Sequence, residues 1–280
     1  MISGVIAALS AAFFSTSKDI GSKSLSSNVS GAASSVGSFL FALPFYICLL
    51  LTAFFFFGER SLFVTAPMFY VILCARALSD ALGESAKMYA LGQGDLSTVS
   101  IFLSFLPIFV LFLSPVITGD PLSSSVFIGT FFVVSGSLIA TSSKNITKKG
   151  AIYALLAAIF MATNTCLDRL AAQSGHPFFA AACMTFFALI FTLPLFLFDG
   201  HPKELLKSRK IFLLRGFFEL LFMVAKLFAL ISLTAPQVMV ILRCALVLNV
   251  LAGKFIFQET QSVRKLCASF LILFGIWIAV

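Results

Sequence analysis

Charged residues are scarce in this chain. Only 11% of its 280 residues are Asp, Glu, Lys or Arg, whereas 60% are hydrophobic, and the mean hydropathy is +1.08. A soluble globular domain carries roughly 25% charged residues. The deficit excludes a soluble protein and predicts a polytopic membrane protein with the lipid bilayer as its surroundings. The basic residues behind the net charge of +8 lie mostly in short segments between apolar runs. Membrane topology explains their position, so we expect no nucleic-acid binding.

Residues that serve enzyme chemistry are also few. The chain has two histidines, His176 and His201, both expected in loops, and it contains no HExxH motif, no GxSxG motif and no metal-ligand cluster. Its six cysteines lie inside apolar runs without CxxC spacing, which indicates small apolar packing residues. We therefore expect a protein that is not an enzyme, without catalytic residues, metal site or cofactor.

One short motif does match an enzyme signature. Residues 92–95 read Gly-Gln-Gly-Asp, the GxGD pattern of intramembrane aspartyl proteases. The motif falls in an expected turn between two helices, where Gly and Asp are common capping residues, and no companion Tyr-Asp sequence occurs. Helix capping therefore explains the motif better than proteolysis.

Long apolar runs make up most of the chain. A membrane-spanning helix needs about 20 mostly apolar residues. On this criterion the sequence predicts ten spanning helices, near residues 3–20, 32–57, 67–91, 96–117, 123–142, 150–168, 177–198, 210–231, 236–256 and 264–280. The predicted fold class is thus an all-α integral membrane protein with short connections and no appended soluble domain.

The two halves of the chain resemble each other. A shift of 146 residues superposes GVIAALSAAFF on GAIYALLAAIF, and a shift of 139 superposes Arg76 on Arg215, Asp80 on Glu219, Lys87 on Lys226 and Asp120 on Glu259. We therefore predict two five-helix repeats, residues 1–143 and 149–280. Because five is odd, the second repeat lies inverted in the membrane. Inverted repeats are typical of secondary transporters, whose substrate site lies near the bilayer midplane between the repeats.

Basic residues gather in alternate loops. Eleven Lys and Arg residues follow the odd-numbered helices, and two, Arg60 and Arg169, follow the even-numbered ones. Because loops rich in Lys and Arg face the cytoplasm, we expect the odd-numbered loops to be cytoplasmic and both termini to lie outside. The expected location is a cell membrane of the bacterial inner-membrane type.

A shared pattern closes each repeat, in residues 86–140 and 225–279: an Ala-Leu pair, a turn of small and polar residues, an acidic residue before the last helix and a Gly-containing end. In this pattern the chain resembles the EamA-type ten-helix members of the drug/metabolite transporter superfamily over essentially its whole length. The resemblance implies a carrier of small metabolites. Two features depart from the family: Asp120 stands where Glu is usual, and many members resemble proteins with cytoplasmic termini, whereas the loop charges here indicate the reverse.

Charges inside the predicted helices mark a candidate site. Arg76, Asp80, Glu84 and Lys87 are spaced by four, four and three residues, so they share one face of helix 67–91. A charge at the bilayer centre costs at least about 2.5–3.5 kcal/mol, so these residues must be paired or face water. We interpret the charges that recur in both repeats as gating or ion-pair residues, namely Arg76, Lys87, Arg215 and Lys226.

Charges that break the repeat symmetry are better suited to an asymmetric substrate. Glu84 aligns with Met223, and Arg243 aligns with Ser104. A guanidinium group matches a carboxylate or phosphate, while a carboxylate suits an ammonium group. The hypothesis is a zwitterionic amino acid or an amino-acid-derived metabolite such as S-adenosylmethionine. The predicted substrate-binding residues are Arg243, Glu84, Asp80, Glu219 and Asn249, with Asn164 as a further polar group that lines the cavity or bonds across helices.

Several alternatives stay open. Lys87, Lys226 and Arg243 would also suit phosphorylated metabolites or nucleotide sugars. A drug exporter and a channel are further alternatives. A buried carboxylate could carry a proton in a coupled cycle, and the carrier could work as a monomer or a homodimer. The charges at matching ends of the first and sixth helices, Lys18 with Asp19 and Asp168 with Arg169, are interpreted as interfacial anchors.

Overall fold

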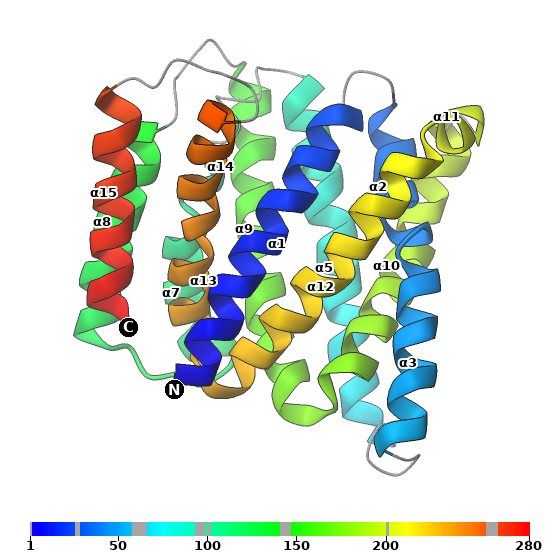
Figure 1. Ribbon diagram of the computed structural model, residues 1–280, viewed down its shortest axis with the longest axis horizontal. Coiled ribbons are helices and arrows are strands. Elements are labelled where there is room, and N and C mark those ends of the chain that lie inside the picture. The colour runs from blue at the N-terminus through cyan, green and yellow to red at the C-terminus, as the bar shows by residue number, and fades with distance from the viewer. Residues whose placement is uncertain are drawn as a thin grey trace.

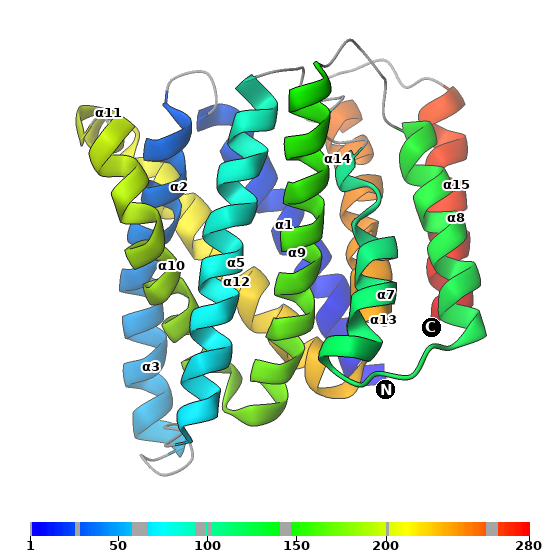
Figure 2. The ribbon, with the colours of Figure 1, turned by 180° about the vertical axis from the view of Figure 1, so that it is seen from behind.

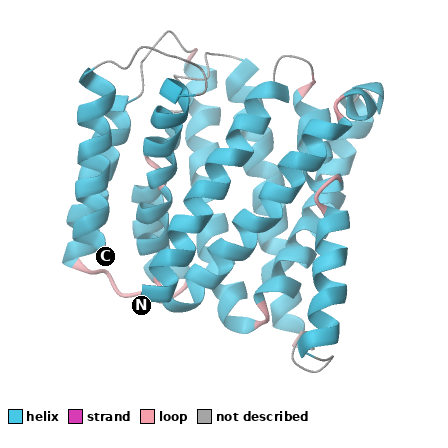
Figure 3. Cartoon of the chain, in the orientation of Figure 1, coloured by secondary structure: helices cyan, strands magenta, loops and turns pink. Residues whose placement is uncertain are grey.

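The computed structural model describes residues 2–25, 29–57, 66–92, 99, 102–140, 147–199, 202–255 and 263–280. Within this part of the chain every regular element is a helix, and short loops join the helices (Figure 3). The helices are α1 (Ile2–Leu25), α2 (Gly31–Leu40), α3 (Leu43–Phe57), α5 (Pro67–Gly92), α7 (Leu106–Ile117), α8 (Ser124–Ala140), α9 (Lys148–Ser174), α10 (Pro177–Asp199), α11 (Pro202–Lys207), α12 (Arg209–Ser232), α13 (Ala235–Leu242), α14 (Cys244–Phe255) and α15 (Val263–Ala279).

The helices lie side by side between two opposite faces of the molecule. Both chain ends lie on one face, the lower one in Figure 1, together with the turns at residues 118–123, 175–176 and 233–234. This face is called the terminal face, and the opposite one the loop face. The first helix, α1, runs from the terminal face to the loop face, whereas α9, its counterpart in the second repeat, runs the other way (Figures 1 and 2). The two five-helix repeats are therefore inverted, as the odd helix number predicts.

Three of the ten predicted spans are interrupted. The span 32–57 divides into α2 and α3 at Phe41–Ala42, the span 96–117 turns at Ser104–Phe105 before α7, and the span 236–256 divides into α13 and α14 at Arg243. Pro44 and Pro107 follow the first two breaks, where a proline removes one backbone donor and disturbs the helix. The third break has no proline.

By length and composition, three helices in the described part of the chain are long and apolar enough to cross a membrane: Ala32–Phe56, Lys148–Ser174 and Pro177–Phe198. Five shorter apolar helices accompany them. The other long helices, α5 and α12, carry the internal charges that lower their hydropathy. Five helices fall short in length and two carry charges, which explains why fewer long apolar helices are found than the ten spans that the sequence predicts.

Contacts between the repeats hold the bundle together. The helix α1 packs along α12, α5 packs along α9, and α8 packs along α15. The first helix of each repeat thus lies against the third helix of the other, and the two last helices pair. Small residues permit the closest approach: a Cβ atom added at Gly129 on α8 would lie 2.5 Å from the carbonyl oxygen of Gly275 on α15. Such glycine contacts are typical of helix pairs in lipid.

The substitution Gly129→Ala should therefore destabilise the protein. Alanine favours a helix by about 1 kcal/mol over glycine, so any loss must come from the collision with Gly275. We expect a lower thermal midpoint in detergent than for Gly83→Ala, where the added Cβ would lie 3.3 Å from the Cβ of Phe160. Equal midpoints for the two variants would contradict the packing described here.

Candidate functional site

A buried network of charges lies where α5, α9 and α12 meet. Asp168 on α9 has no exposed side-chain surface. One of its carboxylate oxygens accepts a hydrogen bond from Arg76 Nε on α5 at 2.9 Å, and the other accepts one from Lys226 Nζ on α12 at 2.6 Å. Because the two cations come from different repeats, this single carboxylate joins both halves of the chain.

The position of Asp168 corrects a prediction from the sequence. The interpretation of Asp168 as an interfacial anchor is wrong, because α9 continues to Ser174, six residues beyond the predicted helix end at residue 168. The longer helix carries Asp168 away from the membrane edge and into the bundle. A buried carboxylate between two cations is an ion-pair centre, since a buried charge needs partners.

Asp80 completes the network. Its carboxylate accepts hydrogen bonds from Arg76 Nη1 at 2.8 Å and from Asn164 Nδ2 at 3.0 Å. Lys226 donates a further hydrogen bond to Thr165 at 3.3 Å. Two carboxylates therefore balance two cations, and neutral polar groups take up remaining bonding capacity, which is the condition for tolerating charges away from water.

A related contact lies between α1 and α12. Lys18 Nζ lies 3.0 Å from Glu219 Oε2 and 4.3 Å from the centre of the Phe222 ring. The two repeat shifts relate this pair to the contact of Asn164 with Asp80: the 146-residue shift superposes Lys18 on Asn164, and the 139-residue shift superposes Asp80 on Glu219. An ion pair in one interface thus corresponds to an amide–carboxylate hydrogen bond in the other. Lys18 is part of this interface, which also corrects its interpretation as an anchor.

The outer charges, Glu84 and Lys87, are partly exposed. Glu84 and Lys87 form an ion pair at 3.0 Å, and their side chains are 22% and 27% exposed, against 0% for Asp168. Because α5 runs toward the loop face (Figure 2), exposure of the charges rises in that direction. The two outer charges are therefore more exposed than the network around Asp168.

Arg243 occupies a different place, at the break between α13 and α14. Its Nη2 donates a hydrogen bond to the carbonyl oxygen of Leu103 at 3.2 Å, beside the break that precedes α7. The two breaks are equivalent: the bond from Phe105 N to Phe102 O recurs 138 residues later as the bond from Arg243 N to Val240 O. Arg243 thus connects the two interrupted helices, one from each repeat.

The Arg243 guanidinium group has spare bonding capacity. Its Nε is buried and has no hydrogen-bond partner, and within the described ranges no carboxylate forms an ion pair with it. A buried cation without a counter-ion is costly. The site can therefore accept an anionic group, for which the guanidinium fork is well shaped.

The structure brings some of the predicted residues together and leaves others in separate contacts. It brings together Arg76, Asp80 and Lys226, whereas Glu84 with Lys87, Glu219 with Lys18, and Arg243 form separate contacts. Arg215 lies four residues before Glu219 on α12. Asn249 belongs to α14, but its side chain lies outside the described residues, as do residues 93–95 of the GxGD motif. No pattern in the sequence indicates the partners of Asp168, because they depend on how three helices meet.

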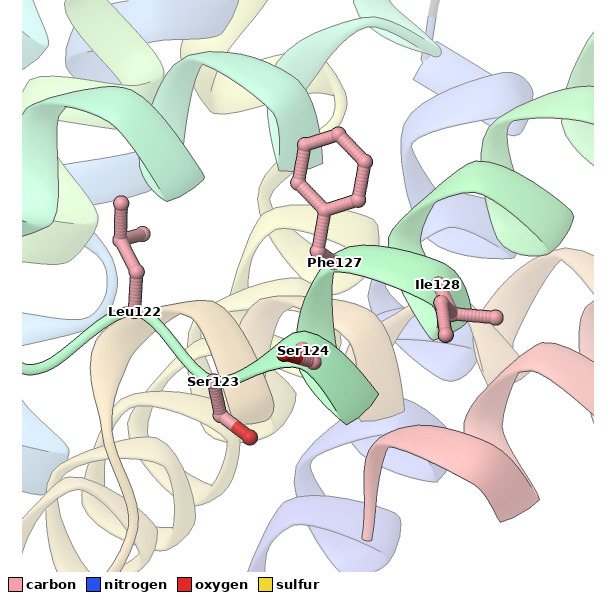
Figure 4. A pocket seen from close by; sticks show the side chains of 5 residues that line it. All are labelled: Leu122, Ser123, Ser124, Phe127 and Ile128. Carbon is pink, nitrogen blue, oxygen red and sulfur yellow. The ribbon is translucent and has the colours of Figure 1, made fainter.

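Other places in the structure offer less chemistry. No group of His, Cys, Asp and Glu side chains in the described part of the chain could hold a metal ion. A hollow of about 280 Å³ at the start of α8 (Figure 4) contains none of the charged residues above. Its lining consists of Leu122, Ser123, Ser124, Phe127 and Ile128. The charged network and Arg243 are therefore the candidate site.

Comparison with known proteins agrees with this architecture. The model of the EamA-like transporter family matches residues 2–142 and again residues 148–280. A solved structure described only as the crystal structure of a protein is similar to this chain with a TM-score of 0.80 and 14% sequence identity. The similarity covers 99% of this chain and 97% of that one and, at such low identity, shows the fold alone. None of the curated proteins matches the sequence.

Replacing Asp168 should destabilise the fold strongly. Asp168→Asn leaves Arg76 and Lys226 buried with only Asp80 to balance them, and removing one partner of a buried ion pair costs about 3–5 kcal/mol. Glu84→Gln is the matched control, because a partly exposed pair contributes only about 0–1 kcal/mol. Thermal or denaturant unfolding in detergent compares the two variants. A loss for Asp168→Asn no larger than for Glu84→Gln would show that the network is not a stabilising centre.

Proposed function

Because the chain belongs to the EamA-like transporter family, whose members are membrane transporters of small solutes, we propose that it is a secondary carrier working by alternating access. The proposed substrate is a zwitterionic amino acid or an amino-acid-derived metabolite, of which S-adenosylmethionine is an example. Inverted repeats with interrupted helices between them support a carrier, because such helices line the substrate sites of secondary transporters near the bilayer midplane.

Arg243 is the observation that carries this proposal. The Nε of its guanidinium group is buried, the group lacks a counter-ion within the described ranges, and it lies at the break of one helix while bonding to the break of another. A substrate carboxylate placed against Nε and Nη2 would satisfy the unbonded donor and form the two parallel hydrogen bonds typical of Arg–carboxylate pairs. The Leu103 carbonyl holds the guanidinium group in place before substrate arrives.

The accessible carboxylates support an ammonium group at the other end of the substrate. Within the described ranges Glu84 pairs with Lys87 and Glu219 pairs with Lys18, and all four side chains retain some exposure. Exchanging a partly hydrated ion-pair partner costs less than disrupting the buried pairs of Asp168, because exposed pairs contribute little. We assign Glu84 and Glu219 to contact the substrate cation and Asp80 to hold the cavity wall.

One observation favours a second candidate class. Six cations are placed around the site (Lys18, Arg76, Lys87, Arg215, Lys226 and Arg243) and four carboxylates (Asp80, Glu84, Asp168 and Glu219), which gives a net charge of +2. A positive cavity attracts anions. Phosphorylated metabolites or nucleotide sugars are therefore the alternative substrates, and an uptake panel needs to include both classes.

The loop charges support an orientation in a bacterial-type inner membrane. We propose that the loop face is cytoplasmic and the terminal face external, because the excess of Lys and Arg follows odd-numbered helices, which end at the loop face. A protease added to intact cells should then remove a C-terminal tag. A tag cleaved only in inverted vesicles would reverse the assignment.

Substitution of Arg243 tests the substrate contact. Arg243→Gln should lower the initial uptake of a labelled zwitterion into proteoliposomes at least about tenfold, because a hydrogen bond to a charged group contributes about 1.5–3 kcal/mol. Arg243→Lys should lose less, since it keeps the charge but not the fork. Ser104→Ala, at the position that the 139-residue shift aligns with Arg243, is the control and should transport normally.

Counterflow in the same vesicles separates a carrier from a channel. Preloading with unlabelled substrate should accelerate uptake by a carrier. Unchanged transport of every tested zwitterion by Arg243→Gln would contradict the proposed contact, and transport restricted to anions would favour the second class of substrate.

A further inference from the structure

A second buried ion pair lies on the terminal face. Arg169 Nε on α9 lies 2.7 Å from Asp120 Oδ1, and both side chains are largely buried. The Nη1 of Arg169 also donates hydrogen bonds to the carbonyl oxygens of Leu230 and Leu233 at the end of α12. The interpretation of Arg169 as an interfacial anchor is thus wrong, because its donors bind protein groups.

The Asp120 carboxylate makes equally specific contacts. Its Oδ2 accepts hydrogen bonds from Ser114 Oγ at 2.9 Å and from the backbone N of Ala235, the first residue of α13, at 3.1 Å. Gly119 precedes it with a φ of 69°, a left-handed conformation that favours glycine and turns the chain before Asp120. Asp120 and Arg169 with these partners are called the clamp.

The clamp joins the two repeats at the terminal face. Asp120 belongs to the turn between α7 and α8 in the first repeat, whereas Arg169 and the turn between α12 and α13 belong to the second. Lys87, near the loop-face end of α5, is 27% exposed, whereas Asp168, next to Arg169 on α9, is 0% exposed. The clamp therefore lies between the substrate region and the terminal face.

The clamp is also connected to Arg243. The helix α13 has eight residues. Its first residue, Ala235, bonds to Asp120, and Arg243 follows its last residue. Because α13 is this short, a shift of Ala235 away from Asp120 would also shift Arg243 relative to Leu103. Contacts at one end of α13 thus affect the geometry at the other.

We propose that the clamp is the gate of the terminal face, and that its opening moves α13 and with it the substrate-binding Arg243. The inference rests on the proposed carrier function and names the residues that close the terminal face of the carrier. Asp120 and Arg169 are positioning residues: they bind no substrate, but they determine which face admits it. A clamp that only stabilises the fold would leave access from the terminal face unchanged when its charges are removed.

A cysteine already in the chain can report this access. Cys166 on α9 is fully buried and lies three residues before Arg169, about one helical turn deeper from the terminal face. The other five cysteines are replaced, and Asp120→Asn or Arg169→Gln is added. A membrane-impermeant thiol reagent is then applied from the side on which a C-terminal tag is accessible. Glu204→Gln, a carboxylate change on α11 at the loop face (Figure 1), is the matched control.

We expect Asp120→Asn and Arg169→Gln to raise the rate of Cys166 labelling from the terminal face at least about tenfold, as loss of one charge from a buried charge-assisted network implies. Labelling from the loop face and the rate in Glu204→Gln should not rise. If the neutral variants do not fold, judged by size-exclusion chromatography, Arg169→Lys is used, which keeps the ion pair but loses the double carbonyl contact and should give a smaller increase.

Equal labelling rates in the parent and in the clamp variants would overturn the proposal. Labelling requires no substrate, so this outcome would leave the carrier assignment intact, whereas absent transport with faster labelling would leave the gate intact. A KM that rises in the clamp variants while the maximal rate is kept would also count against a gate, because a gate limits the rate of conformational exchange.

Discussion

The buried Asp168 carboxylate, placed between Arg76 and Lys226, constrains the arrangement of the surrounding helices. One oxygen binds a cation of the first repeat and the other a cation of the second. Removing any of the three charges would leave an uncompensated charge in a low-dielectric interior. The helices α5, α9 and α12 must therefore stay close together, and α1 follows because Lys18 binds Glu219 on α12.

The next residue in the chain, Arg169, connects this centre to the terminal face. Asp168 and Arg169 are neighbours on α9, so their side chains point about 100° apart around the helix. The first contacts α5 and α12, and the second contacts Asp120 and the end of α12. One helix of the second repeat thus holds both the buried network and the clamp. Any motion of α9 would act on the two together, while Arg243 at the end of α13 responds through Ala235.

Much of this fold follows from the sequence by physical reasoning. Apolar runs of spanning length, two repeat shifts and an odd helix number per repeat predict inverted five-helix units, and the spacing of Arg76, Asp80, Glu84 and Lys87 predicts one charged helix face. The partners of these charges did not follow. The end of α9 was placed six residues too early, which put Asp168 at the membrane edge. The break at Arg243 has no proline, and its contact with Leu103 depends on the packing of two helices far apart in sequence.

The account depends most directly on the coupling between Asp168 and Lys226, which a double-mutant cycle measures. Stability in detergent is compared for Asp168→Asn, Lys226→Gln and the double variant, whose remaining charges, Arg76 and Asp80, balance each other. We predict that the double variant loses clearly less stability than the two single variants lose in sum. The difference, the interaction energy, should lie in the range of about 0.5–3 kcal/mol found for residues in one network. Additive losses would contradict the central place given to Asp168.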